Sequence, residues 1–314
     1  MSASLGDRRV ESWAEAVGRT PLVRLREASE ATGALVLGKL ESRSPGGSLK
    51  DRAVVAIIQA AQVRKALRPG ETLVAASAGN LGISVAMAAS GMGYGALLAV
   101  PEEAPPEYRR LLTGLGAEVL VTPGGEAMRG ALRPAREAVR AVTGRFLVHP
   151  LEDPAAQVGY ESLGQEIWDD LGGRLNVLVA GIGTGATVTG AVRRLRRLGP
   201  VRAVGVEPAR AAVLSGRTAG SLRPHRIAGL GTGFVPPLLD RTLLDRVEAV
   251  EDEDALDAMF ALWVHEGLLV GPSSGATLVA ARRVARPGEV VVAILADTGE
   301  RHLALARSLG RIEI

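Results

Sequence analysis

Residues 177–195 read VLVAGIGTGATVTGAVRRL and decide the fold class. The apolar run at 177–180 has the length of a buried strand, and residues 181–190 supply a glycine-rich turn. The segment that follows carries Val192 and Leu195 at helical spacing. A buried strand, a glycine turn and a helix in this order predict a βαβ unit of a parallel sheet.

The same alternation continues on both sides of this unit. Short apolar runs rich in β-branched residues alternate with segments of helical period. One such helix begins near Lys50, with Ser48 as its expected cap. The sequence therefore predicts an α/β protein of the doubly wound class. The other expected strands lie at residues 73–75, 96–100, 118–121, 201–206 and 290–295.

The composition argues against several classes of protein. A chain of 314 residues with 47% hydrophobic content is long enough for two domains. It has no cysteine and four histidines, none in an HExxH spacing, so we expect no disulfide and no metal site. The net charge of +3 does not indicate nucleic-acid binding, and we interpret the basic run at 193–197 as a solvated helix face. The polar N-terminus and the lack of a long apolar run predict a soluble, cytoplasmic protein without a membrane span.

A lysine at the start of a helix is the first candidate catalytic residue. Residues 44–52 read SPGGSLKDR, so paired glycines and a serine precede Lys50. A helix N-terminus disfavours a cation and should lower the pKa of the Lys50 amine. A neutral amine is what a Schiff base with an aldehyde requires, although a lysine in such a position is more often an ordinary surface residue.

Three more loops follow apolar runs and precede helices. Residues 77–82 (SAGNLG) present Asn80 and unpaired N–H groups that can bind a carboxylate or a ring hydroxyl. The glycine turn at 181–190 can close around a phosphate, and its spacing fits neither GxGxxG nor the P-loop, which argues against a nucleotide-dependent reductase. Residues 271–275 (GPSSG) offer Ser273 to a ring nitrogen, whereas a serine taken alone is an ordinary helix cap.

In their order and spacing, these segments closely resemble the cysteine synthase and cystathionine β-synthase family, the fold-type II pyridoxal-phosphate enzymes. The resemblance covers nearly the whole chain. It also includes residues 17–22 (VGRTPL), 101–110, 116–123 (GAEVLVTP), 204–208 (VGVEP), 225–236 (HRIAGLGTGFVP), 266–275 (EGLLVGPSSG) and 296–301 (ADTGER).

The resemblance implies pyridoxal 5′-phosphate as the cofactor and two doubly wound domains with parallel-type sheets, as in the tryptophan synthase β-subunit. Residues 41–149 would form the smaller domain, and residues 1–40 plus 150–314 the larger one. By the same resemblance, Lys50 forms the Schiff base, Asn80 binds the ring 3-hydroxyl and Ser273 pairs with the ring nitrogen. The residues that would hold the phosphate are Gly183, Thr184, Gly185, Ala186 and Thr187.

The implied substrate contacts depart from the usual pattern of the family. They are Ser77, Ala78, Gly79, Leu81, His149 and Gly229. The carboxylate loop usually reads TSGNTG, so Ala78 and Leu81 replace hydroxyl residues, and His149 occupies the region where a glutamine is usual. Each lost hydrogen bond would cost roughly 1 kcal/mol, so the sequence is compatible with a non-standard donor or nucleophile. Ala186 replaces a glycine of the phosphate loop and should be tolerated at a negative φ.

The implied reaction is β-replacement on a serine-derived amino acid of the O-acetylserine or O-phosphoserine type, through an α-aminoacrylate. Lys50 would act as the base at the α-carbon, and a small nucleophile such as sulfide would add at the β-carbon. A serine at the ring nitrogen suits elimination and replacement better than transamination. Because members of this family commonly form dimers, the resemblance also implies a homodimer.

Two other interpretations stay open. SAGN and residues 148–154 (VHPLEDP) are similar to the serine and threonine dehydratases, which eliminate without replacement. The second is a catalytically silent binding protein with the same fold, against which the combination of Lys50, Asn80 and Ser273 argues. A haem-regulated cystathionine β-synthase is disfavoured because no cysteine is present as an axial ligand.

Overall fold

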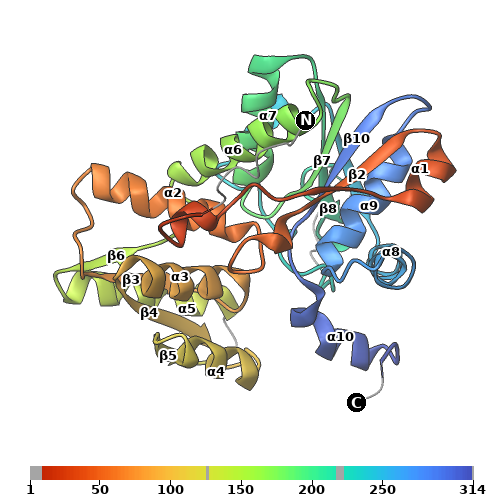
Figure 1. Ribbon diagram of the computed structural model, residues 1–314. Coiled ribbons are helices and arrows are strands. Elements are labelled where there is room, and N and C mark those ends of the chain that lie inside the picture. Colours follow the sequence, from red (N-terminus) through yellow and green to blue (C-terminus); the bar gives the residue numbers. More distant parts are fainter. Residues whose placement is uncertain (1–8, 125–126, 217–222, 313–314) are drawn as a thin grey trace.

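The computed structural model describes residues 9–124, 127–216 and 223–312, and their strands form two sheets (Figure 1). The polar N-terminus at 1–8 lies outside the described residues. The larger sheet has six strands in the order β1 (Leu22–Arg24), β2 (Leu35–Leu40), β10 (Val290–Leu295), β7 (Val177–Gly181), β8 (Arg202–Pro208) and β9 (Arg246–Val250). The smaller has four, in the order β5 (Glu118–Thr122), β4 (Gly95–Pro101), β3 (Thr72–Ala76) and β6 (Arg145–Leu147). All neighbouring strands are parallel except the edge strand β1, which is antiparallel to β2.

Within the described residues, ten α-helices accompany these strands. Those around the smaller sheet are α3 (Asn80–Met92), α4 (Pro106–Gly114) and α5 (Ala127–Ala141). Those around the larger sheet are α1 (Arg26–Thr32), α6 (Ala155–Asp170), α7 (Ala186–Leu198), α8 (Asp252–Glu266) and α9 (Pro272–Val284). The short helix α10 (Leu303–Ser308) leads toward the C-terminus, and α2 (Lys50–Val63) packs against both α3 and α6.

Alternate residues of the central strands face different hydrophobic cores, as a doubly wound sheet requires. In β7, Val177 and Val179 belong to one core together with residues of α8 and α9. Leu178 and Ala180 belong to another, together with residues of α6 and α7. Because both faces of these parallel strands are buried, their sequences read as continuous apolar runs. The predicted α/β class with two parallel-type sheets is confirmed.

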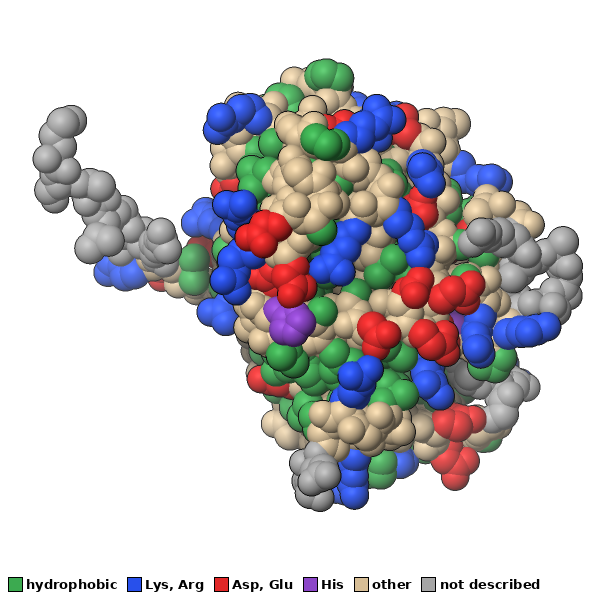
Figure 2. Space-filling model, turned by 90° about the vertical axis from the view of Figure 1, so that its right-hand side faces the viewer, with side chains coloured by type: hydrophobic (Ala, Val, Ile, Leu, Met, Phe, Trp, Pro, Cys, Tyr) green, Lys and Arg blue, Asp and Glu red, His purple; other side chains and the backbone are tan. Residues whose placement is uncertain are grey.

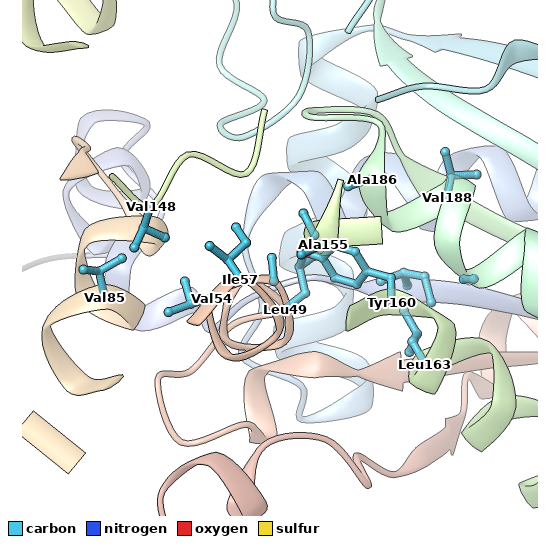
Figure 3. Packing of buried hydrophobic residues seen from close by; sticks show 14 of the residues in the cluster. Leu49, Val54, Ile57, Val85, Val148, Ala155, Tyr160, Leu163, Ala186 and Val188 are labelled. Atoms are coloured by element: carbon cyan, nitrogen blue, oxygen red, sulfur yellow. The ribbon is translucent and has the colours of Figure 1, made fainter. Parts of the chain in front are cut away.

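The helix that begins at Lys50 is embedded between the two sheets. Figure 3 shows Leu49, Val54 and Ile57 at this helix, with Val85 of α3 on one side and Tyr160 of α6 on the other. All five side chains belong to one continuous core that extends from one sheet to the other. The position of Lys50 is therefore set by packing from both halves of the molecule.

Every predicted strand is present. The helix predicted to begin near Lys50 is also present, but the expected cap by Ser48 is not. The residue that precedes the helix is Leu49, and no side chain caps it. Ser48 only accepts a hydrogen bond from the Lys50 N–H at 3.3 Å. The strands that the sequence did not reveal are β1 and β6, which have three residues each, β2, which contains Gly38 and Lys39, and β9, which carries charged residues.

Several surface charges form ion pairs with opposite charges. On the face shown in Figure 2, basic and acidic side chains are interspersed. In the basic run on α7, Arg196 and Arg197 are exposed, as predicted, and lie 2.7 Å from Asp245 and 3.5 Å from Glu161. Arg193 and Arg194 are half-buried and donate to Gln157 and Gln165 of α6. In the described part of the chain, no helix is long and apolar enough to cross a membrane, and no cluster of three acidic or histidine side chains could hold a metal ion.

Candidate active site

The loop that carries Lys50 lies against the segment that follows β10. The Leu49 N–H donates to the Ala296 carbonyl at 2.9 Å, and the Thr298 N–H donates to the Gly47 carbonyl at 3.1 Å. Lys50 is the first residue of α2, so its backbone is held beside the carboxyl end of a central strand of the larger sheet. The carboxyl edge of a parallel sheet is where ligands bind in doubly wound folds.

Only one of the three lysines in the chain has an amine suited to Schiff-base chemistry. Lys39 is fully buried and paired with Glu166 at 3.1 Å, and Lys65 is exposed beyond the end of α2. Lys50 is half-buried, and its amine has no hydrogen bond or ion pair to any described residue. Burial lowers the pKa of Lys50, against the opposing charge of Asp297. The neutral, unpaired amine that the sequence predicted is thus favoured, with burial as the largest cause.

Asn80 is tied to the same segment after β10. Its amide nitrogen donates to Oδ2 of Asp297 at 2.8 Å, and its amide oxygen accepts a hydrogen bond from Arg301. Arg301 also donates to the Gly46 carbonyl. Lys50 and Asn80 lie on different helices, and both helix starts are anchored to the segment after β10.

The glycine turn after β7 forms a cradle at the same edge of the sheet, because β7 is a neighbour of β10. Gly185 has φ +78°, and a Cβ there would lie 2.6 Å from that of Leu239. A Cβ on Gly183 would lie only 2.3 Å from the Gly229 carbonyl oxygen. The N–H groups of Gly183 and Thr184 have no partner among the described residues. Free N–H groups at the start of α7 make a site for an anion such as a phosphate.

The remaining phosphate-loop residues, Ala186 and Thr187, are buried at the first turn of α7. The φ of Ala186 is not positive, which confirms the expectation that alanine is tolerated where a glycine is usual. Thr184 is half-buried, and its hydroxyl lies 3.4 Å from the Ala186 N–H. The whole turn therefore presents backbone N–H groups and hydroxyls rather than charged side chains.

Substituting Gly183 with alanine tests the cradle. The added Cβ would collide with the Gly229 carbonyl, so the turn must widen, and overpacking of this kind costs about 1–3 kcal/mol. We expect the affinity for a phosphate-bearing cofactor to fall by about tenfold, measured by titrating the cofactor-free protein. Gly114→Ala is the matched control, since a Cβ at Gly114 meets no atom within 4 Å. Equal affinity in both variants would rule out a tight cradle at Gly183.

Ser273 is a buried residue in the first turn of α9. Its hydroxyl makes no hydrogen bond to another described residue, so it is available to a ligand. The preceding Gly271 N–H donates to the Asp297 carbonyl at 3.4 Å, which places the start of α9 beside the loop that holds Asn80. These contacts fit a hydroxyl that faces a ring nitrogen.

The predicted carboxylate loop is supported from within by hydrogen bonds. The buried Ser77 hydroxyl accepts the N–H groups of Gly79 at 3.1 Å and Gly82 at 2.8 Å, and it lies 3.0 Å from the Tyr108 hydroxyl. The N–H groups of Asn80 and Leu81, at the start of α3, remain without partners in the part of the chain that the structure describes. A substrate carboxylate would therefore bind chiefly to backbone N–H groups, and contact by the Ser77 hydroxyl itself remains a prediction.

The other predicted substrate residues surround this loop without forming a hydrogen-bonded cluster. Ala78 is exposed and Leu81 is half-buried. His149 follows β6, which pairs with β3, so it lies at the same edge of the smaller sheet as the loop. Burial lowers the pKa of His149, and its Nε2 lies 3.6 Å from Glu152. Gly229 is exposed at φ +85° and faces the phosphate loop through its carbonyl.

Several polar side chains of the candidate site were not predicted. Asp297, Arg301 and His302 lie in or next to the ADTGER segment, to which sequence reasoning assigned no role. Asp51 accepts the Gly46 N–H at 2.6 Å, and burial raises its pKa to about 6. The signal that could have found the first group is their position directly after an apolar strand, at the edge where the glycine turn also begins.

The residues present fit a phosphorylated aromatic aldehyde. An unpaired amine can join an aldehyde, a turn of free N–H groups can hold a phosphate, and an amide and a hydroxyl can contact a ring. The aldehyde would be held beside the end of β10 and the phosphate beside the end of the neighbouring strand β7. Pyridoxal phosphate is the cofactor that carries both groups.

Comparison with known proteins agrees with this chemistry. The family described as "Pyridoxal-phosphate dependent enzyme" matches residues 14–297. A cysteine synthase of Staphylococcus aureus (strain Mu50 / ATCC 700699) is 36% identical over 301 residues, which cover 94% of this chain and 96% of that protein. A crystal structure of O-ureido-L-serine synthase is 35% identical with a TM-score of 0.88, covering 94% of each chain. A cysteine synthase structure from Entamoeba histolytica is 29% identical with a TM-score of 0.92, covering 100% of this chain and 95% of that one.

These matches span nearly the full length of both partners, so they apply to the whole fold and not to one motif. They remove the nucleotide-dependent reductase and the silent binding protein from consideration. The chain belongs to the pyridoxal-phosphate-dependent enzymes of the cysteine synthase type.

Proposed function

We propose that this enzyme replaces the β-substituent of a serine-derived amino acid, with O-acetylserine as donor and Lys50 as the residue that carries pyridoxal phosphate. The observation that carries the proposal is the Lys50 amine, which is half-buried, has no partner among the described residues and has a lowered pKa. The same residue types, in the same order, gave the resemblance in the sequence.

The roles of the other residues follow from their geometry. Pyridoxal phosphate, when bound, supplies an electron-withdrawing ring that makes the α-proton of an attached amino acid acidic. Lys50 would take this proton and later return it. Asn80 would contact the ring hydroxyl, Ser273 the ring nitrogen, and the first turn of α7 the phosphate. The N–H groups of Asn80 and Leu81 would orient the donor's carboxylate.

We also propose that residues 41–149 form the smaller domain and residues 1–40 plus 150–314 the larger one. The four strands of the smaller sheet fall within the first range, and the six strands of the larger sheet fall within the second. The site then lies where the two meet, with Asn80 on one side and the segment after β10 on the other.

The donor and the nucleophile are proposed from the relatives and from the substrate loop. The relatives described above include cysteine synthases and an O-ureido-L-serine synthase, so enzymes of similar sequence are named for different products. Ala78 and Leu81 carry no hydroxyl, which leaves the backbone to bind the donor's carboxylate. We propose sulfide or another small nucleophile as the second substrate.

Two measurements test the assignment. Borohydride reduction of the cofactor-loaded protein, followed by peptide mapping, should fix a pyridoxyl group on Lys50; a label on Lys39 or Lys65 would contradict it. The loaded enzyme is then given O-acetylserine with a panel of small nucleophiles, and the amino-acid product is identified. Formation of pyruvate from serine, with no addition product, would favour a dehydratase instead.

Replacing Tyr108 with phenylalanine tests the carboxylate loop. Burial raises the pKa of Tyr108 to about 12, so its hydroxyl is a neutral donor that supports Ser77 and the Gly79 carbonyl. Losing one such hydrogen bond costs about 1 kcal/mol, so we expect the KM for the donor to rise about fivefold with little change in kcat. Tyr94→Phe is the control, because Tyr94 binds Gln62 at 2.6 Å away from the loop. Equal KM values in the two variants would contradict the loop's role.

We propose in addition that the enzyme is a homodimer in the cytoplasm. A groove of about 520 Å³ lies between α2 and α6, and Val63 and Val158 at its lining are 84% and 63% exposed. Apolar side chains gathered in a surface groove favour an interface between two copies. Light scattering should give twice the chain mass for the wild type and the single chain mass for Val158→Glu. Val264→Glu on α8 is the control and should leave the dimer intact.

We propose the cytoplasm because the cofactor and the activated amino acid are products of intracellular metabolism. Cell fractionation tests this localisation.

A further inference from the structure

Asp297 is a buried carboxylate in the middle of the site, and the proposed function gives it no role so far. It lies just after β10 and is 4% exposed. Its Oδ2 accepts the Asn80 amide at 2.8 Å and lies 2.9 Å from Nε2 of His302. Its Oδ1 is buried and has no hydrogen-bond partner in the described chain. A buried carboxylate oxygen without a partner is costly, which indicates a purpose other than packing.

The backbone around Asp297 leaves room for this carboxylate. A Cβ on Gly271 would lie 2.3 Å from Oδ1 of Asp297, so only glycine fits beside it. Ser48 and Asp297 also form an isolated β-bridge, two residues before Lys50. Three loops therefore converge on Asp297: the one that precedes Lys50, the one that begins α3 and the one that begins α9.

Two charges act on the Lys50 amine and the Asn80 amide from this segment. Asp297 is the charged group that opposes the burial of Lys50 and favours its protonated form. Arg301 donates to the oxygen of Asn80, and the Asp51 carboxylate lies near enough to act on Arg301. His302 contacts the same carboxylate oxygen of Asp297 that accepts from Asn80, and Glu300 is exposed. Asp297 is thus the charge of this segment that acts on the Lys50 amine, and its backbone pairs with the loop that leads into Lys50.

The two partners of Asn80 also fix the orientation of its amide. An amide group has two N–H donors on the nitrogen and an acceptor oxygen. Arg301 can only donate and the Asp297 carboxylate only accepts, so the amide cannot flip. One N–H is taken by Asp297, and the second remains for a ring hydroxyl.

We propose that Asp297 is a positioning residue that holds a proton on the Lys50 nitrogen once this nitrogen is joined to the cofactor, and that fixes the Asn80 amide with an N–H toward the cofactor. The proposal deepens the proposed function and rests on it. Burial disfavours the protonated form of that nitrogen, and the Asp297 carboxylate opposes this effect. With the cofactor bound, a proton on this nitrogen would favour attack by the donor's amine, so Asp297 would prepare the site for its donor.

The test separates the charge of Asp297 from its hydrogen bond. Asp297→Asn removes the charge but keeps an oxygen that can accept from Asn80. Asp297→Ser removes the charge and is too short to reach Asn80, and its small size makes it a second variant should the first fail to fold. Each variant is loaded with pyridoxal phosphate, and its visible absorbance is titrated with pH. Thermal unfolding of the cofactor-free forms shows that both are folded.

In both variants we expect the pH midpoint of the absorbance change to fall by about one to three units relative to the wild type. The cofactor dissociation constant should stay within about threefold in Asp297→Asn and rise about tenfold in Asp297→Ser. Glu300→Gln, which removes an exposed carboxylate of the same loop, should leave both quantities unchanged.

Unchanged midpoints in both Asp297 variants would overturn the proposal, because a merely structural residue would alter stability without altering the titration. A wild-type protein that binds the cofactor without any visible Schiff-base absorbance would contradict the assignment of Lys50 itself. The two failures are therefore distinguishable in the same experiment.

Discussion

Replacing Lys50 with alanine should lower the rate of β-replacement by about 10³-fold or more, because it removes both the attachment point of the cofactor and the base at the α-carbon. The other two lysines cannot substitute for it. Lys39 is held in ion pairs with Glu166 and Asp170, and Lys65 is exposed at the far end of α2. Steady-state rates with O-acetylserine and sulfide, measured at saturating cofactor, give the effect.

Three further readouts distinguish loss of chemistry from loss of fold. The Lys50→Ala protein should bind pyridoxal phosphate without forming a borohydride-reducible bond, and its unfolding free energy should change little. An added small amine should restore part of the rate, because it can supply the missing base. Lys65→Ala is the matched control and should retain wild-type rates. Activity of Lys50→Ala within tenfold of the wild type would exclude Lys50 as the catalytic residue.

The parts of the fold that the sequence predicted are those with a strong local pattern. β7 and β10 are buried on both faces, so their residues form unbroken apolar runs that can be recognised without the structure. The strands β1 and β6, with three residues each, are stabilised by their neighbours, and no pattern marks them. Strand β2 was hidden by Lys39, whose buried amine is paired with Glu166 and Asp170 of a helix distant in the sequence and with the Thr20 carbonyl.

In the candidate site, too, the residues marked by local sequence were predicted and the one that depends on long-range contacts was not. Lys50, Asn80, Ser273 and the glycine turn each lie at the start of a helix, where local sequence determines which groups point outward. Asp297 acts through contacts with residues more than 200 positions away in the chain, such as Asn80. Contacts of this kind depend on how the two sheets pack, so the segment ADTGER could be noticed as a motif but could not be given a role.

The second large effect is on stability, and it comes from a buried ion network around Arg52, two residues after Lys50 in α2. Arg52 donates to Glu41 at 2.7 Å and 2.9 Å, and to Glu166 at 2.8 Å and 2.7 Å. Arg52 is 3% exposed and Glu41 is fully buried. Burial acts to lower the pKa of Arg52, but the two carboxylates outweigh it and raise this pKa. The network joins the first turn of α2 to α6 of the larger sheet, and so it fixes the helix that presents Lys50.

Arg52→Leu should lower the free energy of unfolding by about 3–5 kcal/mol, since it leaves two carboxylates in or near the core without their main partner. Chemical denaturation of the cofactor-free protein at neutral pH measures it. Arg64→Leu is the control, because Arg64 is 52% exposed and lies 3.5 Å from Asp153, so its loss should cost less than about 1 kcal/mol. A similar loss of unfolding free energy in both variants would mean that the buried network stabilises the fold no more than an exposed ion pair does.

The difference between wild type and Arg52→Leu should also shrink in acid. Burial acts to raise the pKa of Glu166, but the hydrogen bonds and charge of Arg52, with Lys39, outweigh it and lower this pKa to about 2. The ionised Glu166 therefore contributes stability above about pH 4.5, its ordinary value, and this contribution is lost as the pH falls toward 2. Without Arg52, Glu166 protonates closer to its ordinary pKa, so the variant has less to lose. The measurement is the free energy of unfolding of both proteins from neutral pH to pH 2.5. A constant difference between them would show that Arg52 does not keep Glu166 ionised. A difference that shrinks toward low pH would identify this ion pair as an interaction that stabilises the helix carrying Lys50.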